Sequence, residues 1–332
     1  MKFLRNVQLP SGFEIDGQKN KQNKIKKVQK PWSKKERFLV LGTLILTVAP
    51  AMFLAFSARS WKVGGLPVLK FPKFSLEETF IIEGDTSTSE LESKLAEITH
   101  AYSGVYGVYV YESKSDFRWG LNKTRKFQAA SLIKLPVMLT LYTHAENGDF
   151  DLDTIYSLKE EDKLGGAGSL RTKPAGTKYS YRELARYMGK ESDNTAFNII
   201  KKQLGPSAIN KFIEGVGMKN TSLEENVTTP QDIGILLHKL YRGELVSPKS
   251  RDEILSFLTN TNFEDWLVNG VPEGVPVAHK FGRETHVIND AGIVFAPSPY
   301  VVVLMSDGII ESEADEALVK LSRFIYESLS QD

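Results

Sequence analysis

The order of the predicted helices and strands constrains the fold of this chain most. Apolar residues recur at helical spacing within residues 90–102, with Ser87, Thr88 or Ser89 as the expected N-cap, and alternating Val and Tyr then predict a hairpin over residues 104–122. Further helices are predicted over 131–146, 180–190, 194–204, 206–216, 230–242 and 248–259. Strands return over 277–282, 286–297 and 300–308, before an amphipathic helix over 312–329. This order predicts an α/β fold of the α+β type, in which terminal helices flank one antiparallel sheet and a helical subdomain is inserted.

Composition limits what this fold can hold. The chain has 332 residues, of which 41% are hydrophobic, so that one large domain with appendages can form a substantial core. It has no cysteine, which excludes disulfides and cysteine-based zinc sites. The five histidines lack the spacing of metal ligands; they are His100, His144, His238, His279 and His286. We therefore expect neither a metal nor an organic cofactor.

The first 37 residues are strongly basic. They hold eleven Lys or Arg against three acidic residues, a balance that is compatible with binding to nucleic acid. Nineteen residues without a charge follow, from Phe38 to Phe56, and this length can cross a bilayer. A buried core helix and a cleaved signal peptide are the alternatives, but the basic leader is far longer than the n-region of a signal peptide. The positive-inside rule then predicts a cytoplasmic N-terminus, and no nucleic-acid partner is expected.

These features divide the chain into four parts. They are a basic cytoplasmic tail at 1–37, a transmembrane signal anchor at 38–57, a juxtamembrane linker at 58–86 and a folded domain at 87–332. The expected location is the cell membrane, with a single pass through the lipid bilayer at 38–57 and the folded domain outside the cytoplasm.

Three short motifs follow one another within the folded domain. They are Ser131-Leu-Ile-Lys134, Ser192-Asp193-Asn194 and Lys280-Phe281-Gly282. Each is weak alone, but together they supply a nucleophile, two candidate proton carriers and an anion-binding strand edge. An active-serine acyl-transfer enzyme needs this set of groups.

The first motif places the candidate nucleophile at a helix start. Ser131 leads into an apolar helix, where free backbone N–H groups favour an oxyanion, although an ordinary N-cap is the simpler role for a serine there. Lys134 lies one turn on and on the same helix face. Its apolar surroundings predict a lowered pKa, with which the neutral amine can act as a base.

The other two motifs have structural alternatives as well. Ser192 can relay a proton to a leaving nitrogen and Asn194 can bind a substrate amide, but Ser and Asp are also common helix caps. Lys280 places a charge near the crevice expected between the sheet and the helical subdomain, and Gly282 lets a backbone come close. A surface lysine on an edge strand is the alternative for Lys280.

From about residue 89 to residue 330, the sequence resembles class A β-lactamases and the related penicillin-binding serine acyltransferases. Beyond the three motifs, the likeness includes residues 129–137, 191–200, 228–234 and 289–297. The resemblance implies a β-lactamase/transpeptidase-like fold. It also implies Ser131 as the acylated nucleophile, Lys134 as its base or proton carrier and Ser192 as the group that helps protonate the leaving group.

The same resemblance implies the substrate contacts. Asn194 would bind the substrate amide and Lys280 would attract its carboxylate. Backbone N–H groups of Ser131 and Arg283, the latter next to Gly282, would form the oxyanion hole.

Two departures from the family pattern bear on the reaction. Phe281 replaces the Thr or Ser that usually helps bind the substrate carboxylate. In addition, class A enzymes carry the glutamate that activates the deacylating water in a long loop before the Thr-Thr-Pro segment. Here only the eight residues 220–227 lead to Thr228, which is too short for that loop. Glu224 or Glu225 is the candidate substitute, with a surface turn as the alternative. The sequence therefore supports acylation better than deacylation.

Together these observations predict a membrane-anchored, extracytoplasmic serine hydrolase. Its expected substrates are β-lactams or D-Ala-D-Ala-like stem peptides of peptidoglycan. These substrates would acylate Ser131, and the enzyme would thereby hydrolyse their amide bond. A penicillin-binding D,D-peptidase and a non-hydrolysing sensor of β-lactams or cell-wall fragments are the alternatives. The motifs do not separate the two substrate classes, because both present an amide carbonyl and a nearby carboxylate.

Overall fold

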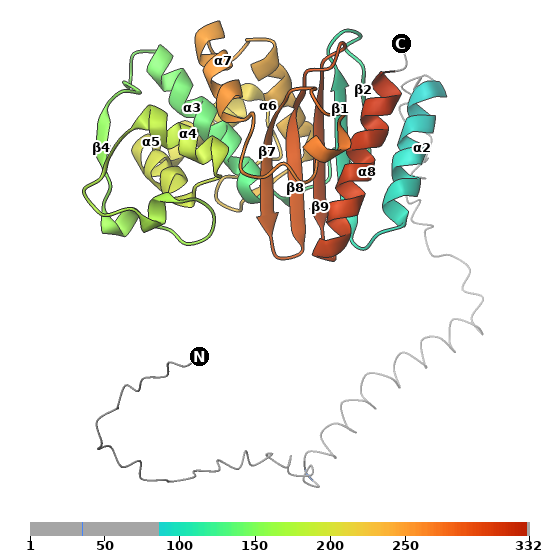
Figure 1. The fold of residues 1–332 in the computed structure, drawn as a ribbon, viewed down its shortest axis with the longest axis horizontal. Helices are drawn as coiled ribbons and strands as arrows, with labels where there is room; N and C mark the ends of the chain where they lie inside the picture. Colours follow the sequence, from blue (N-terminus) through green and yellow to red (C-terminus); the bar gives the residue numbers. More distant parts are fainter. Residues whose placement is uncertain (1–34, 36–85, 331–332) are drawn as a thin grey trace, which may run out of the picture. The chain divides into compact units, whose positions relative to one another are not determined.

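A five-stranded antiparallel sheet is assembled from both ends of the described chain (Figure 1). The computed structural model describes residue 35 and residues 86–330. The strands are β1 (Val105–Glu112), β2 (Arg118–Trp119), β7 (Val277–Glu284), β8 (Val287–Val294) and β9 (Tyr300–Asp307). Their order is β2-β1-β9-β8-β7, so that β7 lies at an edge. The predicted hairpin and the three predicted C-terminal strands are thus confirmed, and they form one sheet.

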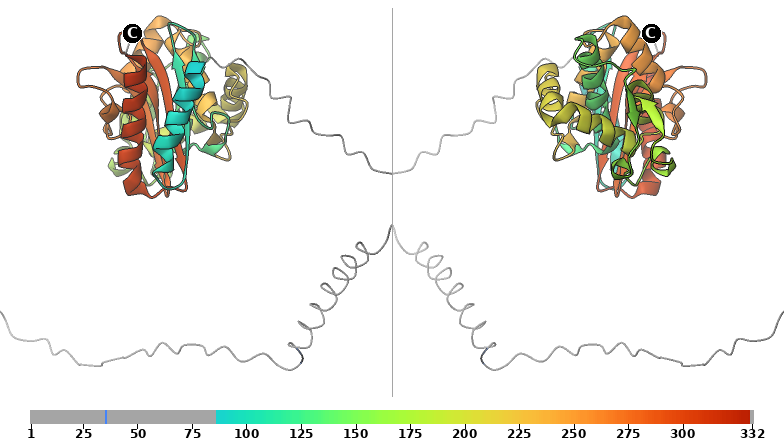
Figure 2. Two further views of the ribbon diagram at one scale, coloured as in Figure 1. Left: turned by 90° about the vertical axis from the view of Figure 1, so that its right-hand side faces the viewer. Right: turned by 90° about the vertical axis from the view of Figure 1, so that its left-hand side faces the viewer.

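Two helices from the ends of the described chain cover one face of the sheet. They are α2 (Thr86–His100) and α8 (Glu311–Leu329), which lie side by side in the views of Figures 1 and 2. Leu95 and Leu318 pack there against β-branched residues such as Val302. The capping prediction is wrong, because α2 begins at Thr86 and residues 87–89 lie inside its first turn. Several Ser and Thr residues in a row can each cap a helix, so the pattern alone does not set which residue comes first.

Helices cover the other face of the sheet as well. The central strands β8 and β9 are therefore buried on both faces. The helix α6 (Pro230–Tyr241) contacts β1, β8 and β9. The inserted subdomain adds α3 (Lys134–Glu146), α4 (Tyr181–Lys190), α5 (Asn194–Val216) and α7 (Pro248–Phe257). All predicted helices of the middle region are confirmed. Two of them are joined in α5, which is kinked where Gly205 takes a φ of +75° before Pro206.

Short strand pairs and single turns complete the described part. β3 (Phe127–Gln128) pairs with β6 (Val227–Thr228), and β4 (Ile155–Ser157) pairs with β5 (Lys178–Ser180). The 3₁₀ turns are η1 (Ala130–Ile133), η2 (Glu160–Asp162), η3 (Leu170–Thr172) and η4 (Val268–Gly270). The pairing of β3 with β6 brings the short segment before Thr228 alongside the residues that lead to Ser131.

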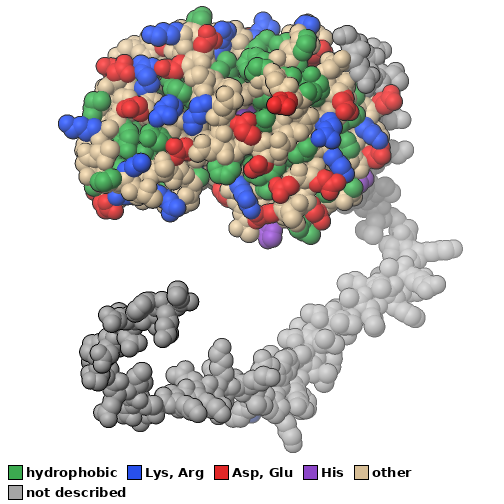
Figure 3. All heavy atoms as spheres, in the orientation of Figure 1, with side chains coloured by type: hydrophobic (Ala, Val, Ile, Leu, Met, Phe, Trp, Pro, Cys, Tyr) green, Lys and Arg blue, Asp and Glu red, His purple; other side chains and the backbone are tan. Residues whose placement is uncertain are grey.

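The predicted tail, anchor and linker lie outside the described residues, except for Lys35 and Thr86. Among the residues that are described, the structure has no helix of the length and apolarity needed to cross a bilayer. On the face of the folded part that Figure 3 shows, basic and acidic side chains are interspersed. This face therefore offers no single-signed basic patch of the kind that binds nucleic acid.

Candidate active site

Ser131 lies in η1, immediately before α3, as the sequence predicts. The residue before it, Ala130, takes a φ of +48°, so the backbone turns sharply at the serine. Neither η1 nor α3 has a side-chain hydrogen bond at its N-cap, and these caps are Ala129 and Ile133. The N-cap alternative for Ser131 is therefore wrong, and its hydroxyl can take part in other contacts.

Lys134 is the centre of a polar network in an apolar surrounding. Its side chain is 3% exposed, and its Nζ lies 3.1 Å from Ser131 Oγ and 3.1 Å from Ser192 Oγ. It also donates to the backbone oxygen of Ser192 and to Asn194 Oδ1, the latter at 2.7 Å. Burial lowers the pKa of Lys134 to about 7, against the opposing charge of Asp193. A large share of the amine is thus neutral near pH 7 and can accept a proton.

The second motif serves both structure and site. Asp193 is the N-cap of α5 and accepts from the backbone N–H groups of Ala196 and Leu170, each at 2.8 Å. The helix-start interpretation is therefore right for Asp193. Ser192, with a φ of +54°, is fully buried beside Lys134. Asn194 bridges Lys134 and the backbone oxygen of Gly165, to which its Nδ2 donates at 2.8 Å.

Gly282 on β7 lies against the backbone at Ser131. A Cβ atom at position 282 would come within 2.8 Å of the Ser131 nitrogen and within 3.0 Å of Ala130 Cβ. The prediction that this glycine allows a close backbone approach is confirmed. The side chain of its neighbour Arg283 turns outward and forms an ion pair with Glu311, so that only the main chain of Arg283 is available to a ligand at Ser131.

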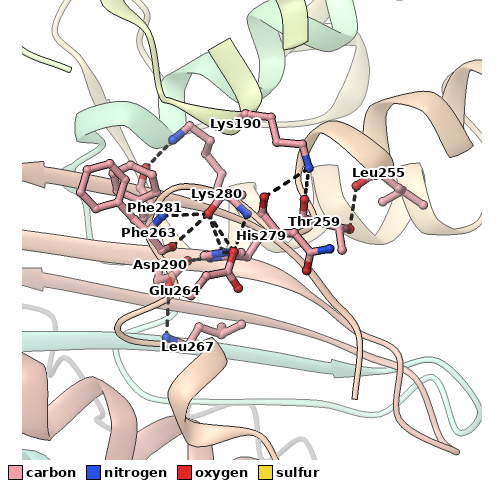
Figure 4. Close-up of polar contacts among 12 residues, drawn as sticks. Lys190, Leu255, Thr259, Phe263, Glu264, Leu267, His279, Lys280, Phe281 and Asp290 are labelled. Carbon is pink, nitrogen blue, oxygen red and sulfur yellow. Dashed lines mark hydrogen bonds and ion pairs between the residues drawn. The ribbon is translucent and has the colours of Figure 1, made fainter. Parts of the chain in front are cut away.

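Lys280 is not a surface lysine, although β7 is an edge strand. It is 1% exposed, and its Nζ donates to the Phe281 oxygen at 2.7 Å (Figure 4). Burial and the charge of Lys134 lower the pKa of Lys280, against the opposing charge of Asp290. The surface alternative for Lys280 is therefore wrong. The first and third motifs lie close enough for the two amines to influence each other.

Phe281 does more than remove a hydroxyl. Side chains alternate across β7, so its ring lies on the opposite sheet face from Gly282 and belongs to the core there. The ring centroids of Phe263 and Trp266 lie 4.3 and 6.2 Å from its own. A threonine at this position would leave a cavity as well as restore a hydroxyl.

The two candidate deacylating residues lie at the surface. Glu224 and Glu225 are both exposed, in the turn that Ser222 and Val227 close with two backbone hydrogen bonds. The surface-turn alternative therefore describes both glutamates. In the same turn, the Asn226 oxygen accepts from Ala129 N at 2.7 Å, close to Ser131. Nothing in the sequence predicts this contact, because only the pairing of β3 with β6 creates it.

The sequence offers no role for His279 beyond the lack of metal-ligand spacing, but the structure places it in a buried network. It is fully buried on β7, where its ring contacts Asp290 on β8 and Glu264. Two ionisable residues in neighbouring apolar strands were a signal that could have predicted this pair. Within residues 86–330 and Lys35, no group of acidic or histidine side chains has the geometry of a metal site.

The described cavities are separate from the motif residues. One of about 590 Å³ lies near the end of α3 and the start of α7, with Arg182, Lys249 and Glu253 in its lining. Another of about 640 Å³ lies beside the start of β7 and is bordered by Glu264. The three motifs instead meet where the edge of the sheet contacts the helical subdomain, and the chemistry at that junction comes from Lys134 and its partners.

Comparison with known proteins agrees with this arrangement. The family model described as "Beta-lactamase enzyme family" matches residues 90–329. A beta-lactamase from Streptomyces albus G is 27% identical over 67% of this chain and 77% of its own length. Beta-lactamase 3 from Bacillus cereus is 25% identical over 68% of this chain and 76% of its own length.

Solved structures show the same fold. The structure of PBP-A has a TM-score of 0.69 and 26% identity, and covers 74% of this chain and 97% of its own. Its L158E mutant, at the same score, is an acyl-enzyme complex with penicillin G. An ancestral class A beta-lactamase has a TM-score of 0.68 over 72% of this chain and 99% of its own, at 24% identity, and shows the fold alone.

Proposed function

Because the chain belongs to the beta-lactamase enzyme family and is a serine hydrolase of that kind, we propose that β-lactams acylate Ser131 and that product release is slow. One observation carries the first half of the proposal. A buried Lys134 amine, with its pKa lowered to about 7, lies 3.1 Å from both the Ser131 and the Ser192 hydroxyl oxygens. The nucleophile and the proton carrier thus each lie within hydrogen-bond distance of the base.

Acylation then proceeds with a balanced transfer of one proton. The neutral Lys134 amine takes the proton from Ser131 Oγ, which forms a bond to the β-lactam carbonyl carbon. The C–N bond of the ring breaks, and its nitrogen receives a proton through Ser192 Oγ, which Lys134 replenishes. Lys134 ends as the neutral amine. The backbone N–H groups of Ser131 and Arg283 would stabilise the oxyanion, and the close approach of Gly282 to the Ser131 nitrogen supports this role.

Slow deacylation, the second part of the proposal, is inferred from the short segment before Thr228. Hydrolysis of the acyl-enzyme requires a base that activates water, and the only glutamates of residues 220–227 are Glu224 and Glu225. Glu224 and Glu225 on that segment are exposed. A penicillin-binding D,D-peptidase is therefore the second candidate. The likeness to PBP-A, whose L158E mutant was captured as an acyl-enzyme with penicillin G, favours it.

We expect intact-protein mass spectrometry to show a persistent adduct on Ser131 after incubation with benzylpenicillin. The adduct should form once per chain and decay much more slowly than it forms. The control is Ser131→Ala, which keeps the fold but lacks the nucleophile. An adduct that disappears within the mixing time supports fast hydrolysis instead. A folded protein without any adduct contradicts acylation and leaves the non-hydrolysing sensor.

We further propose that residues 38–57 anchor the protein in the cell membrane, with the enzyme domain outside the cytoplasm. The nineteen uncharged residues and the eleven preceding Lys or Arg support this orientation. Protease added to intact spheroplasts should digest the domain and spare an N-terminal tag. Two arginines in the uncharged run, as Leu44→Arg with Leu46→Arg, should release the protein from the membrane fraction. A wild-type chain found in the soluble fraction contradicts the anchor.

A further inference from the structure

A buried charged cluster lies across β7 from Lys280 (Figure 4). His279 is fully buried, and its Nδ1 lies 2.7 Å from Asp290 Oδ1. Its Nε2 lies 3.2 Å from Thr261 Oγ1 and 3.4 Å from Glu264 Oε1. We call these four residues, His279, Asp290, Glu264 and Thr261, the His279 clamp.

Two carboxylates keep the imidazole of the clamp charged. Burial alone lowers the pKa of His279, but the charges and hydrogen bonds of Asp290 and Glu264 outweigh it and raise the pKa to about 9. Charged groups that face the clamp from other positions are Lys190, at the end of α4, and Lys280, on the opposite face of β7. Stability from the charged imidazole is complete below the ordinary histidine pKa and is lost as the pH rises through about 9.

The clamp fastens the segment 259–267 to the back of β7. The Leu267 nitrogen donates to the second oxygen of Asp290 at 3.1 Å, and Glu264 accepts from the backbone and hydroxyl of Thr261. The other end of the segment is held by Lys190, whose side chain donates to the Thr259 oxygen. Glu264 also borders the cavity of about 640 Å³, so the clamp has one side near solvent.

This segment carries an aromatic ring toward the third motif. The ring centroid of Phe263 lies 4.3 Å from that of Phe281, and Phe263 is 39% exposed. On the Phe281 ring in turn lies the Lys280 ammonium, 4.0 Å from the ring centroid. The π face of an aromatic ring favours the charged form of an amine, which matters here because burial lowers the pKa of Lys280. Continuous contacts thus join the clamp to Lys280 (Figure 4).

We propose that His279 is a positioning residue for Lys280, acting through the segment that carries Phe263 and through the ring of Phe281. In this arrangement the Phe281 ring packs against the Lys280 ammonium and holds it in place. A Thr or Ser at position 281 would instead contact the substrate directly. The clamp therefore sets where a substrate carboxylate is bound, and it does not take part in the proton transfers at Ser131. The inference rests on the proposed function, because its readout is acylation by a β-lactam.

Two variants test the contacts at different points. Glu264→Gln removes one charge from the clamp but keeps its size, and Phe263→Ala removes the ring that holds Phe281 while leaving the clamp intact. Each should raise the apparent dissociation constant of benzylpenicillin before acylation by about tenfold, because a displaced Lys280 weakens the charge-assisted contact with the substrate carboxylate. The acylation rate constant at saturation should change by less than about twofold, because Lys134 and Ser192 are untouched.

Matched controls separate positioning from general loss of stability. Glu253→Gln removes a carboxylate that pairs with Arg182 in the helical subdomain, and Ile155→Ala truncates an apolar residue that is 58% exposed. Both should leave binding and acylation unchanged. Stopped-flow kinetics over a range of benzylpenicillin concentrations gives the two constants separately, and thermal unfolding of every variant confirms the folded state.

The outcomes are distinguishable. A tenfold weaker initial complex in both test variants, with an unchanged acylation rate constant, supports the positioning role. Unchanged binding in folded Glu264→Gln and Phe263→Ala overturns it and leaves acylation at Ser131 standing, as does a loss confined to the acylation rate constant. A wild-type protein that is not acylated overturns the proposed function and this inference together.

Discussion

Lys134→Met is expected to slow acylation of Ser131 by about a thousandfold near pH 7, the range typical of losing a general base. Methionine has similar length but no amine, so the proton of the Ser131 hydroxyl loses its acceptor 3.1 Å away. The transfer to the leaving nitrogen fails as well, because Lys134 also contacts Ser192 Oγ. Both proton transfers in the proposed mechanism depend on this one side chain.

The pH profile gives the same prediction an independent readout. Burial lowers the pKa of Lys134 to about 7, so the neutral amine, which is the base, predominates only above that pH. Wild-type acylation should rise about tenfold per pH unit below this pKa and level off above it. Lys134→Met should lack this rise. Lys211→Met, at an exposed position of α5, is the control. Wild-type acylation rates in Lys134→Met would contradict the assignment of the base.

Gly282→Ala is the second change with a large expected effect. The new Cβ would come within 2.8 Å of the Ser131 nitrogen, the backbone group proposed to bind the oxyanion. To relieve this contact β7 must move away from η1, which separates the two donors of the oxyanion hole. We expect acylation to fall by about a hundredfold, as when one oxyanion donor is removed. Rapid-quench labelling with benzylpenicillin measures the rate.

The chain contains a matched glycine for comparison. Gly215 lies in α5, and a Cβ there would have no atom within 4 Å. Gly215→Ala should therefore leave acylation unchanged and stabilise the protein by about 0.5–1 kcal/mol, because alanine favours a helix more than glycine does. Equal acylation by Gly282→Ala and wild type would show that the backbone approach at Ser131 is not needed for the reaction.

Most of the fold could be predicted from periodicity. Alternating Val and Tyr gave the hairpin of β1 and β2, and apolar spacing gave the helices of the inserted subdomain. The break that Gly205 and Pro206 predict between two helices is confirmed as the kink in α5, where Gly205 takes a non-helical φ of +75°. The start of α2 was missed because several serines and threonines in a row can each cap a helix.

The site could be predicted in part. Ser131 and Lys134 lie on one turn, so local helix geometry already brings them together. The contacts of Lys134 with Ser192 and of Gly282 with Ser131 join residues far apart in the chain, and the order of the motifs alone could only suggest them. The position of Lys280 near the crevice was predicted, but its nearly complete burial was not, because an edge strand by itself favours an exposed lysine.

The sequence by itself determined the residue types of the chemistry and the elements that carry them. A serine and a lysine one helical turn apart, and a glycine within a strand, follow from local rules that involve few neighbours. Only the tertiary structure decided which groups are buried together: the Lys134 network, the Phe281 ring under Lys280 and the His279 clamp. The reason is physical, since a pKa and a packing contact depend on desolvation and distance in space, and these arise only when distant segments meet.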